Sequence, residues 1–142
     1  TRYFNVFGPR QDPASQYAAV VPLFVTTIDA GEPVTIFGDG EQSRDFTYVA
    51  NVVRATADAG LAPEANGQIM NVAAAAPASV NALADAIGGI LGKEVDKRYA
   101  PERPGDIRDS FADISEARRL IGFEPTVALE EGLRRTIEHL LG

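Results

Sequence analysis

Cysteine is absent from the sequence, and histidine occurs once, as His139. Without cysteine the chain has neither a disulfide framework nor a thiolate metal site, which fits a protein of the reducing cytoplasm. A single histidine cannot supply a histidine-based zinc cluster. We expect His139 to face solvent near a helix C-terminus, where a partial positive charge is favourable, and we find no support for a Ser-His-Asp triad.

Long apolar runs and an excess of basic residues are also missing. No run approaches the roughly 20 residues that cross a bilayer, so we predict no membrane span. Acidic residues outnumber basic ones by 20 to 13, which gives a net charge of −7. Such a chain as a whole repels nucleic acid and anionic lipid. Any phosphate that it binds must be held by a local group of side chains.

What is present suffices for one folded domain, which we expect to span residues 1–142, because a hydrophobic content of 45% supports a packed core. The chain opens on Thr1, without an initiator methionine, in what reads as the middle of a strand. We therefore expect it to be the C-terminal region of a longer protein. The absent N-terminal region would supply the neighbours of that first strand.

Predicted strands and helices alternate along the chain, which indicates an α/β fold with some parallel pairing. Strands 34–37 and 44–49 flank Gly38-Asp39-Gly40 and are predicted to form a small hairpin. Ser79 as an N-cap and Gly92 as an end bound the helix with the clearest 3.6-residue period. The other predicted strands are 3–7, 68–73 and 94–99, and the other predicted helices are 16–30, 50–59, 113–122 and 129–141.

The segment 38–43 imitates a glycine-rich dinucleotide fingerprint. It follows a strand, as such a fingerprint must, but Ser43 replaces the third glycine and another strand follows instead of a helix. A hairpin turn is the better interpretation.

Four segments carry a resemblance to a known family. They read RYFNVFGPRQ at 2–11, PVTIFGDGEQSRDFTYV at 33–49, RPGDIRDS at 103–110 and DISEA at 113–117. Together they resemble the C-terminal half of the extended short-chain dehydrogenase/reductase family, the NAD-dependent nucleotide-sugar epimerases and dehydratases. The resemblance implies an incomplete extended Rossmann-type fold with a few parallel strands and about five helices. Residues 11–20 and 48–52 are most similar to the 4-epimerases of UDP-N-acetylglucosamine and UDP-glucose.

The resemblance implies a role for each matching residue. Asn5 would donate to the diphosphate of a UDP-sugar, and Arg44 and Arg108 would clamp its oxygens because a guanidinium fork fits phosphate geometry. Residues 34–37 would lie near the uracil. The other residues implied to bind substrate are Ser110, beside the sugar or nucleotide, and Gln11, Tyr17 and Ala19, which would line the sugar pocket.

These residues also have structural interpretations. Asn5 could cap a turn at a strand end, and Gln11, Tyr17 and Ala19 could simply belong to a buried helix. Residues 73–76 are alanines where the family usually has glycines, which leaves a close backbone approach there open. The ion pairs considered for the arginines are Arg44 with Asp39, Glu41 or Asp45, and Arg108 with Asp106 or Asp109.

Catalysis in this family needs two elements that the sequence lacks. A nicotinamide cofactor takes and returns a hydride, and a Tyr-x-x-x-Lys pair provides the base. No tyrosine is followed by lysine four residues later, and no glycine-rich βαβ fingerprint opens the chain. We therefore expect NAD to be bound mainly by the missing N-terminal half, and this chain to hold substrate without transforming it. The intact enzyme, expected to be a homodimer, would epimerise a UDP-hexose or UDP-N-acetylhexosamine at C4.

Two other interpretations of the chain remain besides a part of an enzyme. One is a natural stand-alone domain that captures nucleotide-sugars without catalysis. The other is a structural or assembly fragment whose exposed strand edge seeks a partner chain, because an unpaired edge is a template for association.

Overall fold

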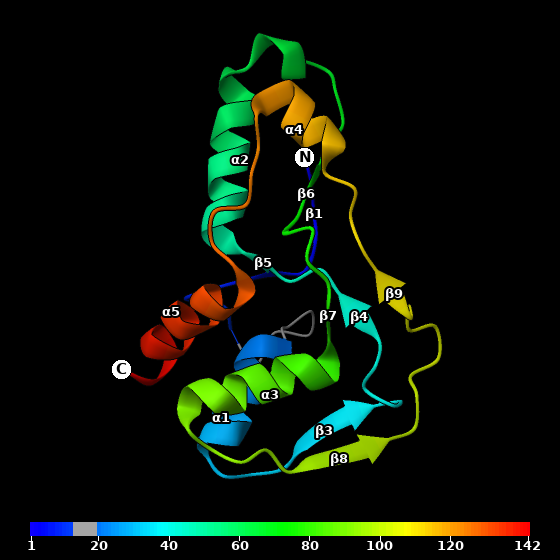
Figure 1. Ribbon diagram of the computed structural model, residues 1–142, viewed down its shortest axis with the longest axis vertical. Coiled ribbons are helices and arrows are strands. Elements are labelled where there is room, and N and C mark those ends of the chain that lie inside the picture. Colours follow the sequence, from blue (N-terminus) through cyan, green and yellow to red (C-terminus); the bar gives the residue numbers. More distant parts are fainter. Residues whose placement is uncertain (13–19) are drawn as a thin grey trace.

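The computed structural model describes residues 1–12 and 20–142, and within them the predicted α/β alternation is confirmed. Figure 1 shows an elongated arrangement with α2 (Val49–Leu61) and α4 (Ser115–Ile121) at one end. The other end contains α1 (Val20–Asp29), α3 (Val80–Leu91) and two strands, while α5 (Leu129–Leu141) lies between the ends. A short 3-10 helix, η1 (Pro63–Ala65), follows α2.

The strands are short, and most of them pair in parallel. β1 pairs with β6, β2 with β5, β3 with β8 and β4 with β9 in parallel, whereas β4 pairs with β7 in antiparallel. Parallel pairing needs crossover connections, and the helices of this chain supply them. The strands are β1 (Arg2–Tyr3), β2 (Val6–Phe7), β3 (Val34–Phe37), β4 (Ser43–Arg44), β5 (Thr47–Tyr48), β6 (Asn71–Val72), β7 (Ala78–Ser79), β8 (Lys97–Ala100) and β9 (Asp109–Ser110).

The predicted strand 3–7 is divided at Asn5. This residue has a φ of 34°, in the left-handed region that asparagine tolerates better than most residues. The resulting bend sends β1 to β6 and β2 to β5, so the two halves of one predicted strand have different partners. The bend also places Asn5 at the end of β1, where its side chain is exposed.

The predicted hairpin of 34–37 with 44–49 is wrong. β3 pairs with β8, and β4 lies between β7 and β9. The glycine turn exists, with φ of 75° at Gly38 and 79° at Gly40, but it is held against the start of α3, where Asn81 Nδ2 donates to the Asp39 carbonyl. After the turn, the chain therefore continues as β4, which pairs with β7 and not with β3.

The predicted helix after Ser79 is confirmed together with both of its ends. The Ser79 hydroxyl accepts a hydrogen bond from the Ala82 N–H, and Gly92 ends the helix in a left-handed conformation. Gly122 ends α4 in the same way. In α5 two i,i+4 ion pairs form, Glu130 with Arg134 and Glu131 with Arg135, and His139 is exposed in the last turn, as expected.

Two hydrophobic clusters support the fold. The first joins α1, α3 and α5 to β2, β3 and β5, with Phe24, Ile36 and Leu133 at most 2% exposed. The second joins α2, α4, η1 and β6 around Val72 and Phe123. Burial of these side chains is the main stabilising contribution in each cluster.

Asp45 links the two clusters. Its side chain is fully buried, and its carboxylate accepts hydrogen bonds from the backbone N–H groups of Ala74 and Ala75. Burial raises the pKa of Asp45, while the surrounding backbone amides act in the opposite direction. The segment that carries Arg44 is thereby attached to the loop that follows β6.

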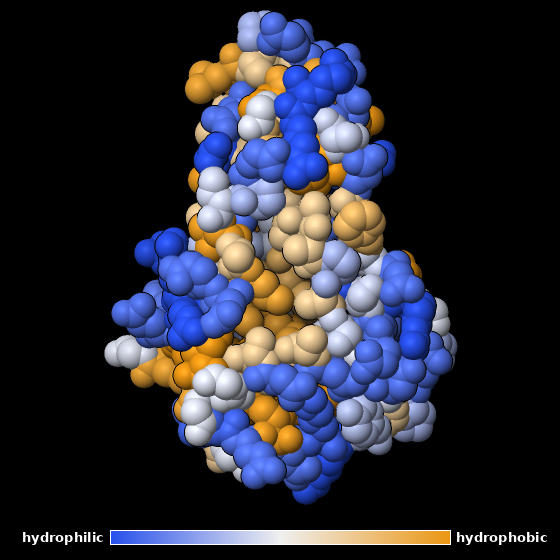
Figure 2. Space-filling view, in the orientation of Figure 1, coloured by the Kyte–Doolittle hydropathy of each residue, from blue (hydrophilic) through white to orange (hydrophobic). Residues whose placement is uncertain are grey.

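The outer surface is uneven in character. Figure 2 shows apolar residues gathered in the middle of one face, with hydrophilic residues over α5 on one side and over the β9 region on the other. Across the described part of the chain, every helix is too short or too polar to traverse a lipid bilayer.

Candidate functional site

Asn5 and Arg44 line the same cavity, which has a volume of about 220 Å³. Asn5 reaches it from the bend between β1 and β2, and Arg44 from β4. The aromatic rings of Phe24, Phe37 and Phe46 contribute to the apolar part of the wall. The amide of Asn5 and the guanidinium of Arg44 thus lie beside an apolar wall. In such a cavity the polar groups orient and hold a ligand.

Arg44 is fixed by Ser43 on β4 and by Asp106 in the loop before β9. Its Nη2 lies 2.5 Å from Oδ1 of Asp106, and its Nη1 donates to the Ser43 carbonyl at 2.7 Å. The side chain is 18% exposed, so this ion pair is partly shielded from water. The partner is thus Asp106, whereas Asp39, Glu41 and Asp45 were the carboxylates considered from the sequence.

Arg108 lines a neighbouring cavity of about 230 Å³. The two cavities share Phe37, Gln42 and Asp106 in their walls, so they adjoin. Arg108 Nη1 lies 2.9 Å from both carboxylate oxygens of Asp39. This partner also differs from those considered, because Asp106 binds Arg44 and Asp109 accepts a hydrogen bond from Ser43.

The turn that carries Asp39 is well braced. Asp39 Oδ1 accepts a hydrogen bond from the Glu41 N–H, and Asn81 donates to the Asp39 carbonyl. The Glu41 N–H and the Arg108 guanidinium hold the pKa of Asp39 below its usual range, and Asp39 in turn raises the pKa of Arg108. Both members of the pair are therefore charged at neutral pH.

Gln11 lines a third cavity of about 180 Å³, together with Asn5 and Phe46. Its Nε2 donates to the Val6 carbonyl at 3.2 Å. This cavity shares Asn5 and Phe46 with the one that contains Arg44, so the three cavities form a series. Tyr17 and Ala19, the other two residues expected to line a sugar pocket, lie outside the described residues.

Ser110 is beside the site without lining it. In β9 it is the register partner of Arg44, and it is half-buried. As far as the described residues go, it is not part of the wall of the three cavities. Its structural place is next to Arg44, as a member of the strand that supports this arginine.

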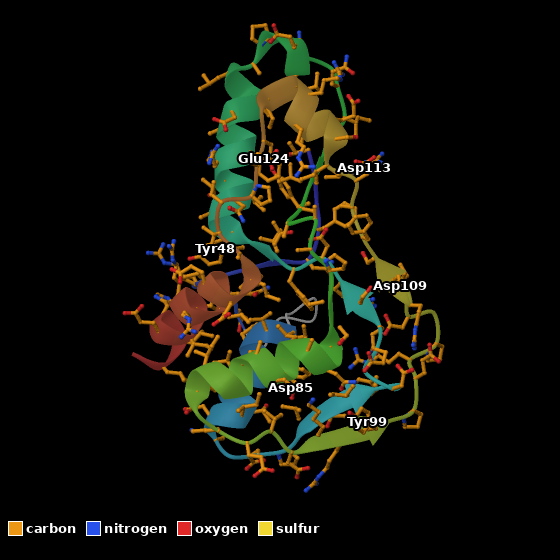
Figure 3. All side chains as sticks on the ribbon, viewed as in Figure 1. Tyr48, Asp85, Tyr99, Asp109, Asp113 and Glu124 are labelled. Carbon is orange, nitrogen blue, oxygen red and sulfur yellow. The ribbon has the colours of Figure 1, made fainter. Side chains whose placement is uncertain are left out.

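Arg103 is a cavity residue that sequence reasoning missed. It lines the cavity of Asn5 and Arg44, with its Cζ 3.8 Å from the centre of the Phe37 ring. The signal was available, because Arg103 opens the RPGDIRDS segment in which only the second arginine was singled out. Figure 3 marks Tyr99 on β8 and Asp109 on β9, the two strands between which the loop of Arg103 runs.

The chemistry available here is anion binding. Three guanidinium groups and the amides of Asn5 and Gln42 line adjoining cavities, and guanidinium is well suited to phosphate. In residues 1–12 and 20–142, no three side chains of the metal-binding types come together. The sequence also lacks the Tyr-x-x-x-Lys pair and the glycine fingerprint of a nicotinamide dinucleotide site.

Comparison with known proteins gives consistent matches. A model of the NAD dependent epimerase/dehydratase family matches residues 1–73. The chain is 42% identical to the UDP-glucose 4-epimerase of Mycolicibacterium smegmatis over 134 residues, which cover 94% of this chain and 42% of that protein. It is 36% identical to the UDP-glucuronate 4-epimerase of Thermodesulfobacterium geofontis over 96% of this chain and 41% of the relative.

Solved structures agree with the sequence matches. The UDP-glucose 4-epimerase of Thermotoga maritima with UDP-glucose superposes with a TM-score of 0.90 at 42% identity, over 97% of this chain and 44% of that one. The UDP-N-acetylglucosamine 4-epimerase of Methanobrevibacter ruminantium in complex with UDP-N-acetylmuramic acid gives 0.91 at 44% identity, over 99% and 44%. The chain therefore spans less than half the length of the proteins that it matches.

Proposed function

The chain belongs to the NAD-dependent epimerase/dehydratase family, and we propose that it is the nucleotide-sugar-binding part of an enzyme that epimerises a UDP-hexose or UDP-N-acetylhexosamine at C4. The observation that carries this proposal is the convergence of Asn5 and Arg44 on one cavity, with Arg108 lining the cavity beside it. These residues come from distant stretches of the chain, so their meeting is a product of the fold.

In this proposal Arg44 and Arg108 hold the diphosphate, and Asn5 donates a hydrogen bond to it. Arg103 adds a second positive charge to the wall that Arg44 lines. A guanidinium fork can donate two parallel hydrogen bonds to phosphate oxygens, which fixes orientation as well as position. Holding the diphosphate firmly leaves the sugar free to reorient, and this is how remote binding energy can serve a reaction at C4.

Gln11 is proposed to face the sugar. Its cavity adjoins that of Arg44 on the side of Asn5, away from the cavity of Arg108. In the same proposal Tyr17 and Ala19 belong to the sugar pocket, and Ser110 supports Arg44 from β9.

The hydride chemistry is proposed to reside outside this chain. NAD supplies hydride transfer in such an enzyme, and this sequence lacks the glycine-rich fingerprint that would bind it and the Tyr-x-x-x-Lys pair that would provide the base. Because the relatives are more than twice as long as this chain, we propose that an N-terminal half completes the enzyme. We also propose that the completed enzyme is a cytoplasmic homodimer, to be checked by light scattering and cell fractionation.

Calorimetric titration tests the binding role. The 142-residue chain should bind UDP, UDP-glucose and UDP-N-acetylglucosamine, without forming the C4 epimer in a product assay. Arg44→Ala should weaken binding of all three ligands. Arg54→Ala is a matched control, because Arg54 is a half-exposed arginine on α2 that pairs with Asp58 and does not line the three cavities. Absence of UDP binding by the wild type would overturn the proposal.

A further inference from the structure

Arg108 is occupied by an internal carboxylate. Its Nη1 is 2.9 Å from each oxygen of Asp39, and both residues line the same cavity. A carboxylate that offers two oxygens to one guanidinium makes the kind of contact that a phosphate group would make. Asp39 and a bound phosphate therefore require the same hydrogen-bond donors.

Asp39 is held in this position by its turn. Its Oδ1 also accepts from the Glu41 N–H at 2.9 Å, and its carbonyl accepts from Asn81 Nδ2 at 3.0 Å. Asn81 Oδ1 in turn accepts from the Tyr99 hydroxyl at 3.0 Å. The placement of Asp39 beside Arg108 is thus fixed by several hydrogen bonds that do not involve the arginine.

The two ion pairs of the site differ in how readily a ligand could open them. Arg44 and Asp106 are 18% and 29% exposed, whereas Arg108 and Asp39 are 59% and 56% exposed. An exposed ion pair is weakened by water and salt, and it contributes little to stability. The Asp39 pair is therefore the one that an incoming phosphate can replace.

We propose that Asp39 is an affinity-determining residue that competes with the phosphate of the ligand for Arg108. This inference rests on the proposed function, because it takes Arg108 to bind the diphosphate. Before the ligand binds, the carboxylate of Asp39 balances the positive charge of the Arg108 guanidinium and orients it. When the ligand binds, a phosphate oxygen replaces the Asp39 carboxylate at Arg108. The affinity for the ligand is therefore lower than it would be if Arg108 had no carboxylate partner.

Asp39→Asn removes the competing charge and keeps the turn. The amide oxygen of asparagine can still accept from the Glu41 N–H, since asparagine favours this type of turn. We expect Asp39→Asn to bind UDP about two- to fivefold more tightly than the wild type, as the loss of an exposed competing ion pair predicts. Binding of uridine, which has no phosphate, should not change.

Glu41→Gln is the matched control. This substitution removes one negative charge two residues from Asp39. In the wild type the Glu41 carboxylate accepts a hydrogen bond from Asn81 and does not pair with Arg108. If Glu41→Gln tightened UDP binding as much as Asp39→Asn, the effect would be one of overall charge and the inference would be wrong. Asp39→Ser, whose hydroxyl can also cap the turn, replaces Asp39→Asn if that variant lacks a cooperative thermal transition.

A double-mutant cycle with Arg108→Ala separates this inference from the proposed function. In the Arg108→Ala background, Asp39→Asn should leave UDP affinity unchanged, because the group competed for is gone. The inference alone is overturned if Asp39→Asn raises UDP affinity equally with and without Arg108. It is also overturned if the wild type binds UDP and Asp39→Asn does not raise this affinity. Failure of the wild type to bind UDP overturns the proposed function and this inference with it.

Discussion

The guanidinium carbon of Arg103 lies 3.8 Å from the centre of the Phe37 ring, so a cation covers an aromatic face in the wall of the cavity. Planar guanidinium stacks on a ring better than a compact ammonium does. We expect Arg103→Lys to weaken UDP binding by about two- to fivefold, because the charge remains but its placement over Phe37 is lost. Titration calorimetry measures this change.

Phe37→Leu supplies the control for that prediction. If Phe37 positions Arg103, then the effects of Arg103→Lys and Phe37→Leu on UDP affinity should not add in the double variant. Additive effects would mean that Arg103 is placed without help from the ring.

Arg44→Ala should lower the affinity for UDP by about 2–3 kcal/mol, since a hydrogen bond to a charged group is lost in a partly shielded place. The substitution also leaves Asp106 without its guanidinium partner at the cavity wall. Arg44→Lys should recover only part of the loss, because an ammonium cannot bind phosphate and Asp106 with a planar fork. An affinity of Arg44→Ala equal to that of Arg54→Ala would remove Arg44 from the site.

Features decided by neighbouring residues were predictable from the sequence, and features decided by distant ones were not. Ser79 and Gly92 bound α3 as expected, because capping depends on the residues at each helix end. The partner of β3 was missed because β8 is far away along the chain, and no local signal distinguishes it from the strand after the glycine turn. The local pattern favoured the hairpin, and tertiary packing overrode it.

The candidate site follows the same rule. The resemblance of short segments proposes Asn5, Arg44 and Arg108 as site residues, and the fold brings them to adjoining cavities. The carboxylates that pair with the two arginines were not identified, because each pair joins residues from opposite sides of α3 in the sequence. Which charges meet is a property of the whole fold, and charge spacing along the chain does not encode it.

Asp45 should make stability depend on pH in an unusual direction. Burial raises its pKa above the unfolded value, so the folded state binds the proton more tightly than the unfolded chain does. The contribution of this group to the free energy of unfolding is therefore greatest below the unfolded pKa of about 3.9, and it is lost as pH rises through the folded value.

Asp45→Asn isolates that contribution. Asparagine imitates the protonated acid and does not titrate, so the variant should lack the pH dependence that Asp45 contributes. The free energy of unfolding of the wild type should therefore rise relative to that of the variant as pH falls, since only the wild type gains from protonation. Urea denaturation over a range of acidic to neutral pH measures this difference, and a fall of the wild-type value relative to the variant toward acid pH would contradict the prediction.

Ala75 has a φ of 54°, a conformation that costs an L-residue about 1–2 kcal/mol. Glycine adopts it freely but loses more entropy on folding, by about 0.5–1 kcal/mol. We therefore expect Ala75→Gly to raise the free energy of unfolding by about 0.5–1 kcal/mol. Ala74→Gly, at a neighbouring residue without positive φ, should instead lower it, and a similar sign for both substitutions would show that the strain at Ala75 is unimportant.

Gly40 has both a positive φ, of 79°, and no space for a side chain. A Cβ placed there would lie 2.4 Å from Oδ1 of Asn81, the residue that holds the turn through the Asp39 carbonyl. Gly40→Ala should lower the free energy of unfolding by about 2–4 kcal/mol, because left-handed strain and displacement of Asn81 act together. Gly31→Ala is the control, since Gly31 has a φ of 71° and no atom within 4 Å of the position that an alanine methyl group would take. Gly31→Ala should lower the free energy of unfolding by the left-handed strain alone, about 1–2 kcal/mol. Thermal or urea unfolding measures both variants. Equal losses of stability at the two positions would mean that Asn81 moves aside without cost and does not brace the turn.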